Sequence, residues 1–387
     1  MPIETRILDA KAVTSGPKFH YFGYYDKTPW NASGRYLLSL EIGFMDRMPT
    51  PEDACGIGMV DLKDGNRWIP LAQTKAFNWQ QGTMLQWLGS APDRMIIYND
   101  VRNGHFAAVV RDTQSGEGYD LPLPIYAVTP DGKWGVTPNF ARIHRTRPGY
   151  GYCALPDPGK GDPAPADDGI RLMNLENGSN SLIITYRQIA EYQKKESMKD
   201  AEHWFNHLQF SPDGSRFIFL HRWSKKGGGW FTRLYTANRD GSGICLLADD
   251  DMTSHFDWRD PDHVLAWAQQ FNIGCFYFLF KDRTREHEII GKGTLDCDGH
   301  CSYSPDRKWI LTDTYPKKNE RTLILYEPAT ARRIDIGRFY SAPEITGPFR
   351  CDLHPRWDRS GGQVCIDSIH EGTRHIYVLD VSPITRG

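Results

Sequence analysis

The sequence of 387 residues predicts an all-β fold, a seven-bladed β-propeller, from a repeated segment and from the spacing of its copies. The segment begins with a histidine, has an aromatic residue three positions later and continues into a turn. It occurs four times, starting at His207, His255, His300 and His354. The intervals of 48, 45 and 54 residues are close to the period of about 40 to 50 residues that propeller blades of four strands show.

Three earlier segments keep this template without the histidine and bring the predicted number of blades to seven. They start at Lys27, Met84 and Ile125. Apolar, β-branched or aromatic runs follow the turns, for example residues 217–220 and 309–312. Such runs are typical of strands, and the Ser-Pro-Asp-Gly pattern before several of them favours a tight turn because Pro presets φ and Gly accepts positive φ.

The two ends of the chain are predicted to meet in one blade. The last repeat, which starts at His354, supplies three convincing strands, and residues 4–10 have the composition of a spare strand. Ring closure would leave no exposed sheet edge. We therefore predict that an N-terminal strand closes the last blade.

Two stretches depart from the repeat. Residues from about 143 to 170 are rich in Gly, Pro and Asp and are predicted to form a long excursion between strands. Residues from about 186 to 199 have helical composition and are predicted to form a short insertion outside the ring. Residues 1–387 are otherwise predicted to form a single propeller domain.

Composition limits the kinds of partner. Aromatic residues make up 12% of the chain, beside 36 Gly and 25 Pro, which suits a β-rich protein with many turns. The formal net charge of -2 argues against a general nucleic-acid binder, which normally has a basic surface. No apolar run approaches the ~20 residues of a membrane span, and the N-terminus lacks the apolar core of a signal peptide. We expect a cytoplasmic protein with no nucleic-acid or membrane partner, although a secreted protein without its leader would look the same; the oligomeric state is left open.

The repeated histidines are predicted to face a shared cavity, since the first strands of propeller blades line the central channel. Imidazole suits both metal binding and acid-base chemistry, and a structural role beside backbone groups is the alternative. Thiolate and carboxylate side chains near the third histidine would suit zinc or manganese. The predicted metal ligands are His255, Cys297 and His300, with Asp257 and Cys301 in reserve. No organic cofactor is predicted.

Arginines and aromatic residues form a second set at the predicted channel mouth. Arginine forks bind carboxylates bidentately, and a planar aromatic side chain suits a sugar ring. This combination predicts an acidic oligosaccharide or polysaccharide as the partner, although a tryptophan in such a run can equally be part of the core. The predicted substrate-binding residues are Asn206, His221, Trp223, Arg350 and His354.

Several segments resemble the propeller-fold polysaccharide lyases. Segments 204–214, 254–258, 298–306 and 352–357 resemble oligogalacturonate lyases. Residues 21–30 and the Arg-Pro-Gly-Tyr-Gly-Tyr loop that ends at Tyr152 are more similar to propeller ulvan lyases. The Ser-Pro-Asp-Gly turn itself is common to many propellers and carries little weight.

The two resemblances imply different sites. Oligogalacturonate lyases hold a central metal with histidines and a glutamine, and His255 and His300 match two of those positions. Cys297 stands where the glutamine is expected and Ser302 where a further histidine is expected. The ulvan-lyase pattern implies a metal-independent site, with a histidine and a tyrosine for proton transfer and an arginine for the carboxylate.

These residue types fit β-elimination at a 4-linked uronate. Loss of the C5 proton develops charge on the carboxylate, which arginine or a metal must stabilise. A base takes that proton and an acid protonates the departing O4 oxygen. The predicted catalytic residues are His105 or His207 as the base, Tyr150 as the acid, and Arg222 with Arg142 or Arg350 as the carboxylate clamp.

Two other functions stay open. A glycoside hydrolase on the same scaffold would need two carboxylates beside the bond, and Asp26, Asp100, Asp257 and Asp313 are available. A non-catalytic propeller that binds a protein or a sugar complex would tolerate replacement of the repeated histidines. The fold alone does not decide among these functions.

Overall fold

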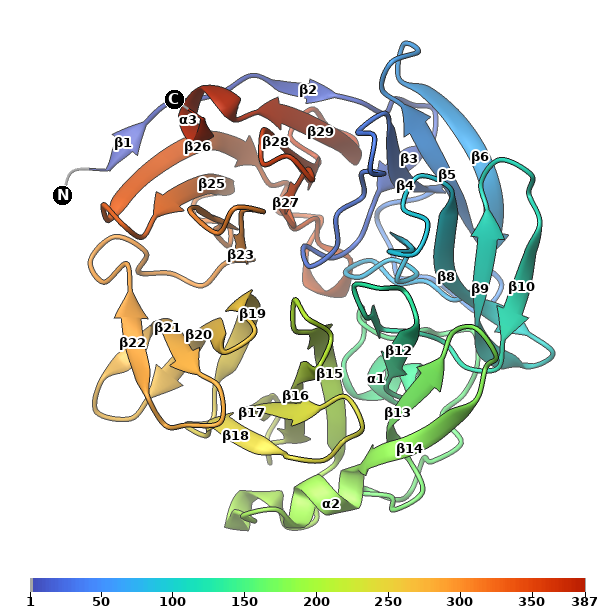
Figure 1. The fold of residues 1–387 in the computed structure, drawn as a ribbon, viewed down its shortest axis with the longest axis vertical. Helices are drawn as coiled ribbons and strands as arrows, with labels where there is room; N and C mark the ends of the chain where they lie inside the picture. The colour runs from blue at the N-terminus through green and yellow to red at the C-terminus, as the bar shows by residue number, and fades with distance from the viewer. Residues whose placement is uncertain (1–2, 387) are drawn as a thin grey trace.

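The computed structural model describes residues 3–386 and has seven β-sheets arranged around a central axis (Figure 1). The predicted seven-bladed β-propeller is therefore confirmed. Six sheets have four strands and one has five. Each sheet is one blade, and the blades follow one another around the ring in chain order.

The first four blades, read from the axis outward, contain the following strands. Blade 1 has β3 (Phe19–Tyr21), β4 (Tyr36–Ile42), β5 (Cys55–Asp61) and β6 (Arg67–Thr74). Blade 2 has β7 (Gln86–Trp87), β8 (Met95–Arg102), β9 (His105–Asp112) and β10 (Gly118–Leu121). Blade 3 has β11 (Ala127–Val128), β12 (Trp134–Thr137), β13 (Gly169–Asn174) and β14 (Asn180–Thr185). Blade 4 has β15 (His203–Phe210), β16 (Arg216–Ser224), β17 (Trp230–Asn238) and β18 (Cys245–Ala248).

The remaining blades complete the ring. Blade 5 has β19 (Thr253–Asp260), β20 (His263–Gln270), β21 (Gly274–Lys281) and β22 (His287–Ile290). Blade 6 has β23 (Ser302–Tyr303), β24 (Ile310–Asp313), β25 (Glu320–Glu327) and β26 (Arg332–Tyr340). Blade 7 has β27 (Arg356–Trp357), β28 (Gln363–Ser368), β29 (His375–Asp380) and the N-terminal β2 (Ala10–Ala12), and α3 (Ser382–Thr385) follows it.

The ring closes with an N-terminal strand, as predicted. Strand β2 pairs antiparallel with β29, with Ala10 opposite Leu379. The predicted spare strand of residues 4–10 is divided, because β1 (Glu4–Thr5) lies parallel to β26 and becomes the fifth strand of blade 6. The N-terminal segment thus joins two neighbouring blades.

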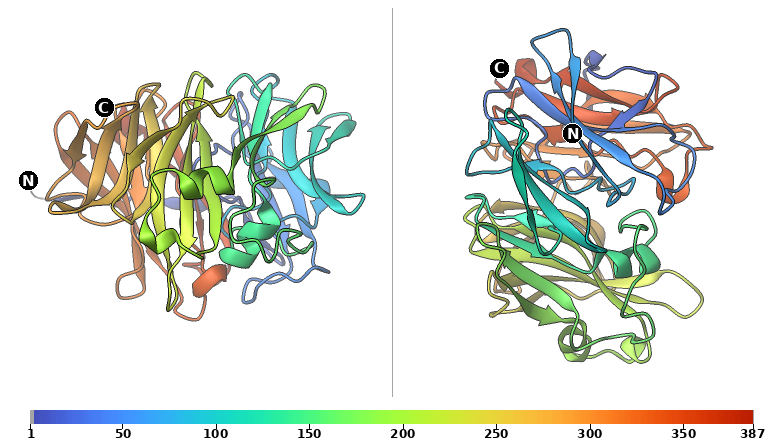
Figure 2. Two further views of the ribbon diagram at one scale, coloured as in Figure 1. Left: turned by 90° about the horizontal axis from the view of Figure 1, so that it is seen from below. Right: turned by 90° about the vertical axis from the view of Figure 1, so that its right-hand side faces the viewer.

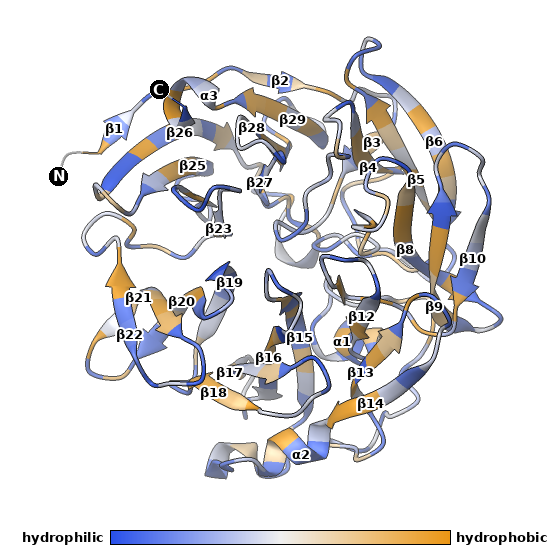
Figure 3. Cartoon of the chain, viewed as in Figure 1, coloured by the Kyte–Doolittle hydropathy of each residue, from blue (hydrophilic) through white to orange (hydrophobic). Residues whose placement is uncertain are grey.

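The middle strands of the blades are buried on both faces because each blade packs between two others. In β16, Phe217, Ile218, Phe219 and Leu220 are all fully buried, and successive side chains of a strand point to opposite faces. Hydrophobic residues accordingly run along the strands, whereas many connecting loops are hydrophilic (Figure 3). None of the helices in the described chain is long and apolar enough to cross a membrane.

Two departures from the repeat lie between strands. Residues 138–168 separate β12 from β13 and include α1 (Phe140–Thr146), whose first turn is capped by the Asn139 side chain. After β14 come α2 (Tyr186–Glu191) and η1 (Glu196–Met198). Helix α1 and η2 (Gly347–Phe349) lie on the same face of the disc (Figure 2), which we call the loop face. The opposite face carries the Ser-Pro-Asp-Gly turns, and we call it the turn face.

The central channel is occupied by the chain between β3 and β4. This loop reaches from blade 1 toward the axis (Figure 1). It carries Tyr24 and Tyr25, both of which are buried. The loop therefore divides the channel into a part toward the loop face and a part toward the turn face.

Candidate active site

The four repeated histidines lie together near the axis. They come from blades 4 to 7, and each is at most 5% exposed. Going around the axis, the ring centroids of His207 and His255 are 6.5 Å apart, those of His255 and His300 are 4.2 Å apart, and those of His300 and His354 are 4.4 Å apart. The register of the repeat thus places four imidazoles in one arc, which we call the histidine arc.

Tyr24 lies inside the histidine arc and contacts all four rings. Its ring stacks on His207 at 4.9 Å with an interplanar angle of 4°. The other three centroid distances are 6.5 Å to His255, 6.1 Å to His300 and 5.1 Å to His354. The Tyr24 hydroxyl lies 3.3 Å from His207 Nε2. Tyr24 therefore contacts one histidine from each of blades 4 to 7.

His207 is held by its neighbours at both ring nitrogens. Its backbone has a positive φ of 51°, which is uncommon for a residue with a side chain, and the pairing of β15 with β16 shifts register beside it. Gln81 Nε2 lies 3.0 Å and Tyr126 Oη 3.2 Å from His207 Nδ1. Burial, and next the charge of Arg222, lower the pKa of His207 well below its usual value. The ring is therefore neutral at neutral pH.

The next two histidines are oriented by carboxylates. His255 Nδ1 lies 2.9 Å from Asp298 Oδ1, and His300 Nδ1 lies 2.9 Å from Asp313 Oδ1. A carboxylate at one ring nitrogen fixes the tautomer and makes the other nitrogen a better ligand. For His300 that other nitrogen, Nε2, is buried and has no hydrogen-bond partner among residues 3–386.

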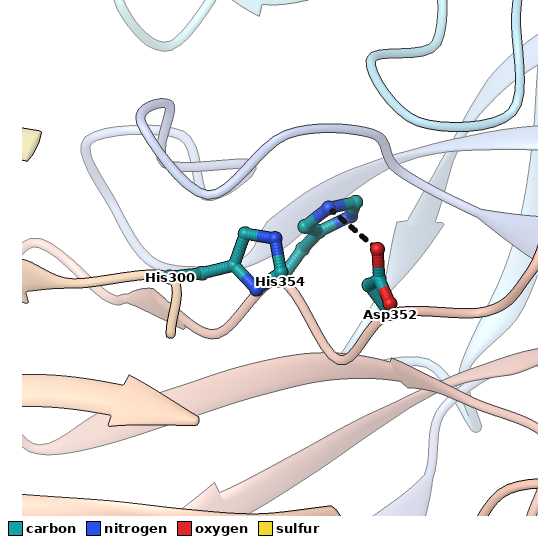
Figure 4. A group of neighbouring side chains, drawn as sticks. All are labelled: His300, Asp352 and His354. Atoms are coloured by element: carbon teal, nitrogen blue, oxygen red, sulfur yellow. Dashed lines mark ion pairs between the residues drawn. The ribbon is translucent and has the colours of Figure 1, made fainter. Parts of the chain in front are cut away.

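One group in the described chain has the geometry of a metal site. It consists of His300, Asp352 and His354, with one candidate ligand atom from each residue and all three atoms within 4.8 Å of one another (Figure 4). His354 Nε2 is also buried without a partner among the described residues. Burial raises the pKa of Asp352, but Arg350 and Arg321 more than offset this and hold it well below its usual range. Two imidazoles and an anionic carboxylate fit a divalent ion such as manganese or zinc.

This group differs from the predicted metal ligands, of which it contains only His300. His255 is adjacent in the arc, but neither it nor Cys297 belongs to the group. Burial raises the pKa of the Cys297 thiol, which disfavours the thiolate that metals bind. Of the reserve ligands, Cys301 is buried in a hydrophobic cluster, and Asp257 accepts hydrogen bonds from Gln209 Nε2 and from the Tyr303 backbone.

Tyr150 lies beside the histidine arc on its loop-face side. It packs with Tyr24, and its ring meets His207 edge-on at 5.6 Å. Arg350 Nη2 donates a hydrogen bond of 2.9 Å to its hydroxyl, and the Arg147 guanidinium lies 4.7 Å from its ring centroid. Burial raises the pKa of Tyr150, but the charges of Arg350 and Arg147 more than offset this and lower it. The lowered pKa makes Tyr150 a stronger acid than an ordinary tyrosine.

Arg222 and Arg147 are positive charges without a carboxylate partner within 4.0 Å in the described chain. Arg222 is 5% exposed, and its Nε and Nη1 are buried without hydrogen-bond partners. Burial, and next Arg147, lower the pKa of Arg222 to about 10, so it stays charged at neutral pH. The Arg147 guanidinium stacks 4.1 Å from the Trp230 ring. Two guanidinium groups without a carboxylate partner favour the binding of an anion at this part of the site.

Two predicted catalytic residues occupy other places. His105 is exposed at the β8–β9 hairpin, where its Nδ1 lies 3.4 Å from the Asn103 carbonyl. Arg142 is fully buried and donates hydrogen bonds to the backbone carbonyls of His203 and Pro163. Arg142 therefore ties α1 to blade 4 and to the excursion, and neither residue joins the histidine arc.

Two predicted sugar contacts belong to the protein core. Trp223 is fully buried and packs against Met198 and Ala201. His221 is fully buried, with Nε2 2.8 Å from Nδ1 of His203. Neither side chain is accessible to a substrate, which corrects their predicted role.

The other predicted substrate contacts lie at the site. Asn206 precedes His207, its Oδ1 accepts the His207 backbone N–H, and its Nδ2 is buried without a partner among residues 3–386. Arg350 contacts Tyr150, and His354 belongs to the histidine arc.

Several residues of the site carried little or no signal in the sequence. Tyr24 lies on a loop outside the repeat, and only the likeness of residues 21–30 to other propellers marked it. Arg147 could be a solvated loop charge from its sequence context. Asp352 begins one of the segments that resemble oligogalacturonate lyases but was not predicted as a metal ligand, and Trp230 had no distinguishing pattern. Only the folded ring brings them to the axis.

Four carboxylates were candidates for hydrolysis, and they do not lie together at the histidine arc. Asp313 is hydrogen-bonded to His300, and Asp100 is paired with Arg102. Asp26 and Asp257 line a common cavity that opens toward the turn face. No pair of them is placed to act beside Tyr150.

The fold and the site define a seven-bladed propeller with a buried axial cluster of histidine, tyrosine and arginine. No family model and no curated protein sequence matches the chain. Among solved structures, oligogalacturonate lyase from Vibrio parahaemolyticus is similar with a TM-score of 0.66 and 14% identity, over 97% of this chain and 94% of that one.

A second oligogalacturonate lyase, solved in complex with manganese, has a TM-score of 0.68 and 14% identity, over 98% of both chains. The tricorn protease has a TM-score of 0.53 and 10% identity, over 100% of this chain and 35% of that protein. The predicted resemblance to propeller-fold polysaccharide lyases is thus confirmed for the fold, over nearly the whole chain.

Proposed function

We propose that this protein is a lyase that cleaves a uronate-containing oligosaccharide by β-elimination. The observation that carries the proposal is Arg222, a buried guanidinium with two unpartnered nitrogen atoms, Nε and Nη1, and no carboxylate partner within 4.0 Å in the described chain. A desolvated cation of this kind is a binding site for a carboxylate or another oxyanion. The similarity in fold to two oligogalacturonate lyases supports a uronate as that anion.

The proposed chemistry begins with the carboxylate held by Arg222 and Arg147. Loss of the C5 proton moves negative charge onto this carboxylate, and fixed guanidinium groups stabilise that charge more strongly in a buried site than in water. Trp230, against which Arg147 stacks, offers a flat apolar surface for the sugar ring. The arginines therefore bind the substrate and stabilise the intermediate.

Two side chains are proposed to move the protons. His207 is neutral, and in the tautomer whose Nδ1–H donates to Tyr126 Oη its Nε2 is free to accept a proton. The Tyr24 hydroxyl, 3.3 Å from Nε2, takes the C5 proton and passes its own proton to His207. Tyr150, whose pKa is lowered by Arg350 and Arg147 despite its burial, gives its proton to the departing O4 oxygen. Of the two predicted bases, the proposal keeps His207 and drops His105.

The proposal includes a divalent metal at His300, Asp352 and His354. When bound, such an ion supplies Lewis-acid stabilisation of a carboxylate. Manganese is the first candidate because one of the similar lyase structures is a manganese complex. In the protein itself, Asp313 orients His300, while Arg321 and Arg350 hold Asp352 in place with ion pairs of 2.7 Å each.

The test is incubation with oligogalacturonates and with glucuronate-containing oligosaccharides, with and without added Mn²⁺. A lyase produces an unsaturated uronate, which absorbs in the ultraviolet. Replacement of His207 by Gln should abolish this signal, and replacement of the exposed His105 by Gln is the matched control. New reducing ends without ultraviolet absorbance would indicate hydrolysis, and binding without products would indicate a non-catalytic propeller; either result would refute the proposal.

A further inference from the structure

A second polar cavity lies on the axis, on the turn-face side of the loop that carries Tyr24 and Tyr25. It consists of two adjoining hollows, of about 360 Å³ and about 170 Å³, which share five lining residues: Asp26, Lys27, Gln209, Asp257 and Arg307. All seven blades contribute to the lining, and Pro130, Pro212 and Pro305 of the turns stand at its rim. We call it the turn-side cavity.

The turn-side cavity is separate from the candidate active site. The lining of the cavity contains none of the four histidines, and Gln209, Asp257 and Ser302 follow His207, His255 and His300 by two positions toward the turn face. Tyr25 stands between the two. Its ring meets His255 and His300 at 5.7 Å and 5.5 Å, and it also lines the turn-side cavity.

Three oxygen atoms of the turn-side cavity are buried without a hydrogen-bond partner among residues 3–386. They are Asp26 Oδ1, Gln209 Oε1 and Ser302 Oγ. The Asp26 side chain and Ser302 are each only 8% exposed. Buried polar atoms are nearly always hydrogen-bonded, so these acceptors call for a ligand that brings N–H or O–H donors.

The buried charges of the turn-side cavity are paired, unlike those of the active site. Lys27 Nζ lies 2.6 Å from Asp26 Oδ2, and both side chains are at least nine-tenths buried. Arg307 Nη1 lies 3.9 Å from Asp257 Oδ2. A charged ligand would disturb these pairs, whereas a neutral ligand with several hydroxyl groups could donate to the free oxygens and accept from Lys27 and Arg307.

The walls of the turn-side cavity also suit such a ligand. Trp357 and Tyr303 line the larger hollow, and a volume of about 360 Å³ is at the lower end of the range for small-molecule sites, which are mostly apolar with a few placed polar groups. We infer that the turn-side cavity binds an uncharged sugar unit. The protein then has two carbohydrate sites on one axis, an anionic one toward the loop face and a neutral one toward the turn face.

The probes for this inference are methyl α-D-galactoside and methyl α-D-glucoside, with galacturonate as the charged counterpart. Isothermal titration with the full chain should show saturable binding of a neutral glycoside. Ser302→Val should weaken that binding about five-fold, the worth of one hydrogen bond. Arg307→Met, at a side chain that is 40% exposed, should weaken it to a similar degree without affecting the core.

The matched control is Ser179→Val, at an exposed serine between β13 and β14, which should bind as the unaltered protein does. Thermal unfolding identifies any variant that fails to fold. If Ser302→Val does not fold, the inference is tested by Arg307→Met alone. The inference is overturned if neither glycoside binds at up to about 50 mM, which would saturate a low-millimolar site. It is also overturned if both variants bind unchanged. Because no turnover is measured, the result is independent of the proposed lyase activity.

Discussion

The two sides of the axial cluster differ in how their charges are compensated. Around His300, both carboxylates have partners: Asp313 is hydrogen-bonded to His300, and Asp352 is paired with Arg321 and Arg350. Around Tyr150, Arg147 and Arg222 have no carboxylate within 4.0 Å in the described chain. The first side is complete as a set of metal ligands, whereas the second requires an anion from outside.

The difference in charge compensation indicates a different role for each side in binding one substrate. An unpaired buried charge is costly to keep, so the arginine side gains most from a bound carboxylate. The metal side is already neutralised and can act on a group whose charge develops later. We therefore expect the arginine side to dominate substrate binding and proton transfer, and the metal side to contribute less.

Among the residues around the two arginines, the largest effect is expected for Tyr150→Phe. Loss of the phenol removes the proposed proton donor but keeps the ring that packs on Tyr24 and His207. The turnover number should fall by about 10²–10⁴-fold, as is typical when a general acid is lost. The turnover number is measured from initial rates of formation of the ultraviolet-absorbing product. Activity within a factor of about three of the unaltered protein would show that another residue is the acid.

Arg222→Gln should have the next largest effect. Without the guanidinium, the developing carboxylate charge loses its main stabilising partner, and we expect a loss of about 10²–10³-fold in turnover. Arg222→Lys should recover only part of it because an ammonium group cannot form a bidentate pair. A variant that changes KM alone would show that Arg222 only binds the substrate.

The fold was predictable because each copy of the repeat marks the first strand and the following turn of one blade. The spacing of the histidine segments predicted blades, and three earlier segments with the same template brought the predicted number to seven. The same register placed four imidazoles in one arc. Ring closure was predicted from the missing strand of the last repeat. The position of the closing strand was not, because residues 4–10 were expected to form it, whereas β2 pairs with β29 from Ala10 onward and β1 joins blade 6.

The site was less predictable because neighbouring residues of a strand face opposite ways. The run of residues 221–223 looked like one constellation, but in β16 Arg222 faces the axial cluster while His221 and Trp223 point to the opposite face and are buried. Tyr24 and Asp352 lie outside the repeat and reach the axis only in the closed ring. Their roles depend on contacts between distant segments.

The metal side can be tested with Asp313→Asn. Because Asp313 orients His300, its loss should weaken Mn²⁺ binding by about 10–100-fold, as measured by isothermal titration. Asp298→Asn is the matched control, since Asp298 holds His255, which is outside the group of His300, Asp352 and His354. Equal losses in both variants would instead support the originally predicted ligand set that includes His255 and Cys297.

The smallest expected effect is a shift in pH dependence caused by Arg147→Gln. If Tyr150 acts as an acid, activity requires its protonated form and falls as the pH rises through its pKa. That pKa is below the usual value because Arg350 and Arg147 more than offset the effect of burial. Removing Arg147 should therefore raise the pKa and move the alkaline limb of the rate profile upward by about one pH unit.

The direction of this shift separates the two roles open to a tyrosine with a lowered pKa. A phenolate that acts as the base would give activity that rises with pH, and Arg147→Gln would then move an acidic limb upward and lower the rate at neutral pH. If the alkaline limb does not move, that limb reflects the titration of a group other than Tyr150. Because Arg147 belongs to the uncompensated side and has no contact with His300, Mn²⁺ affinity should not change in the same variant.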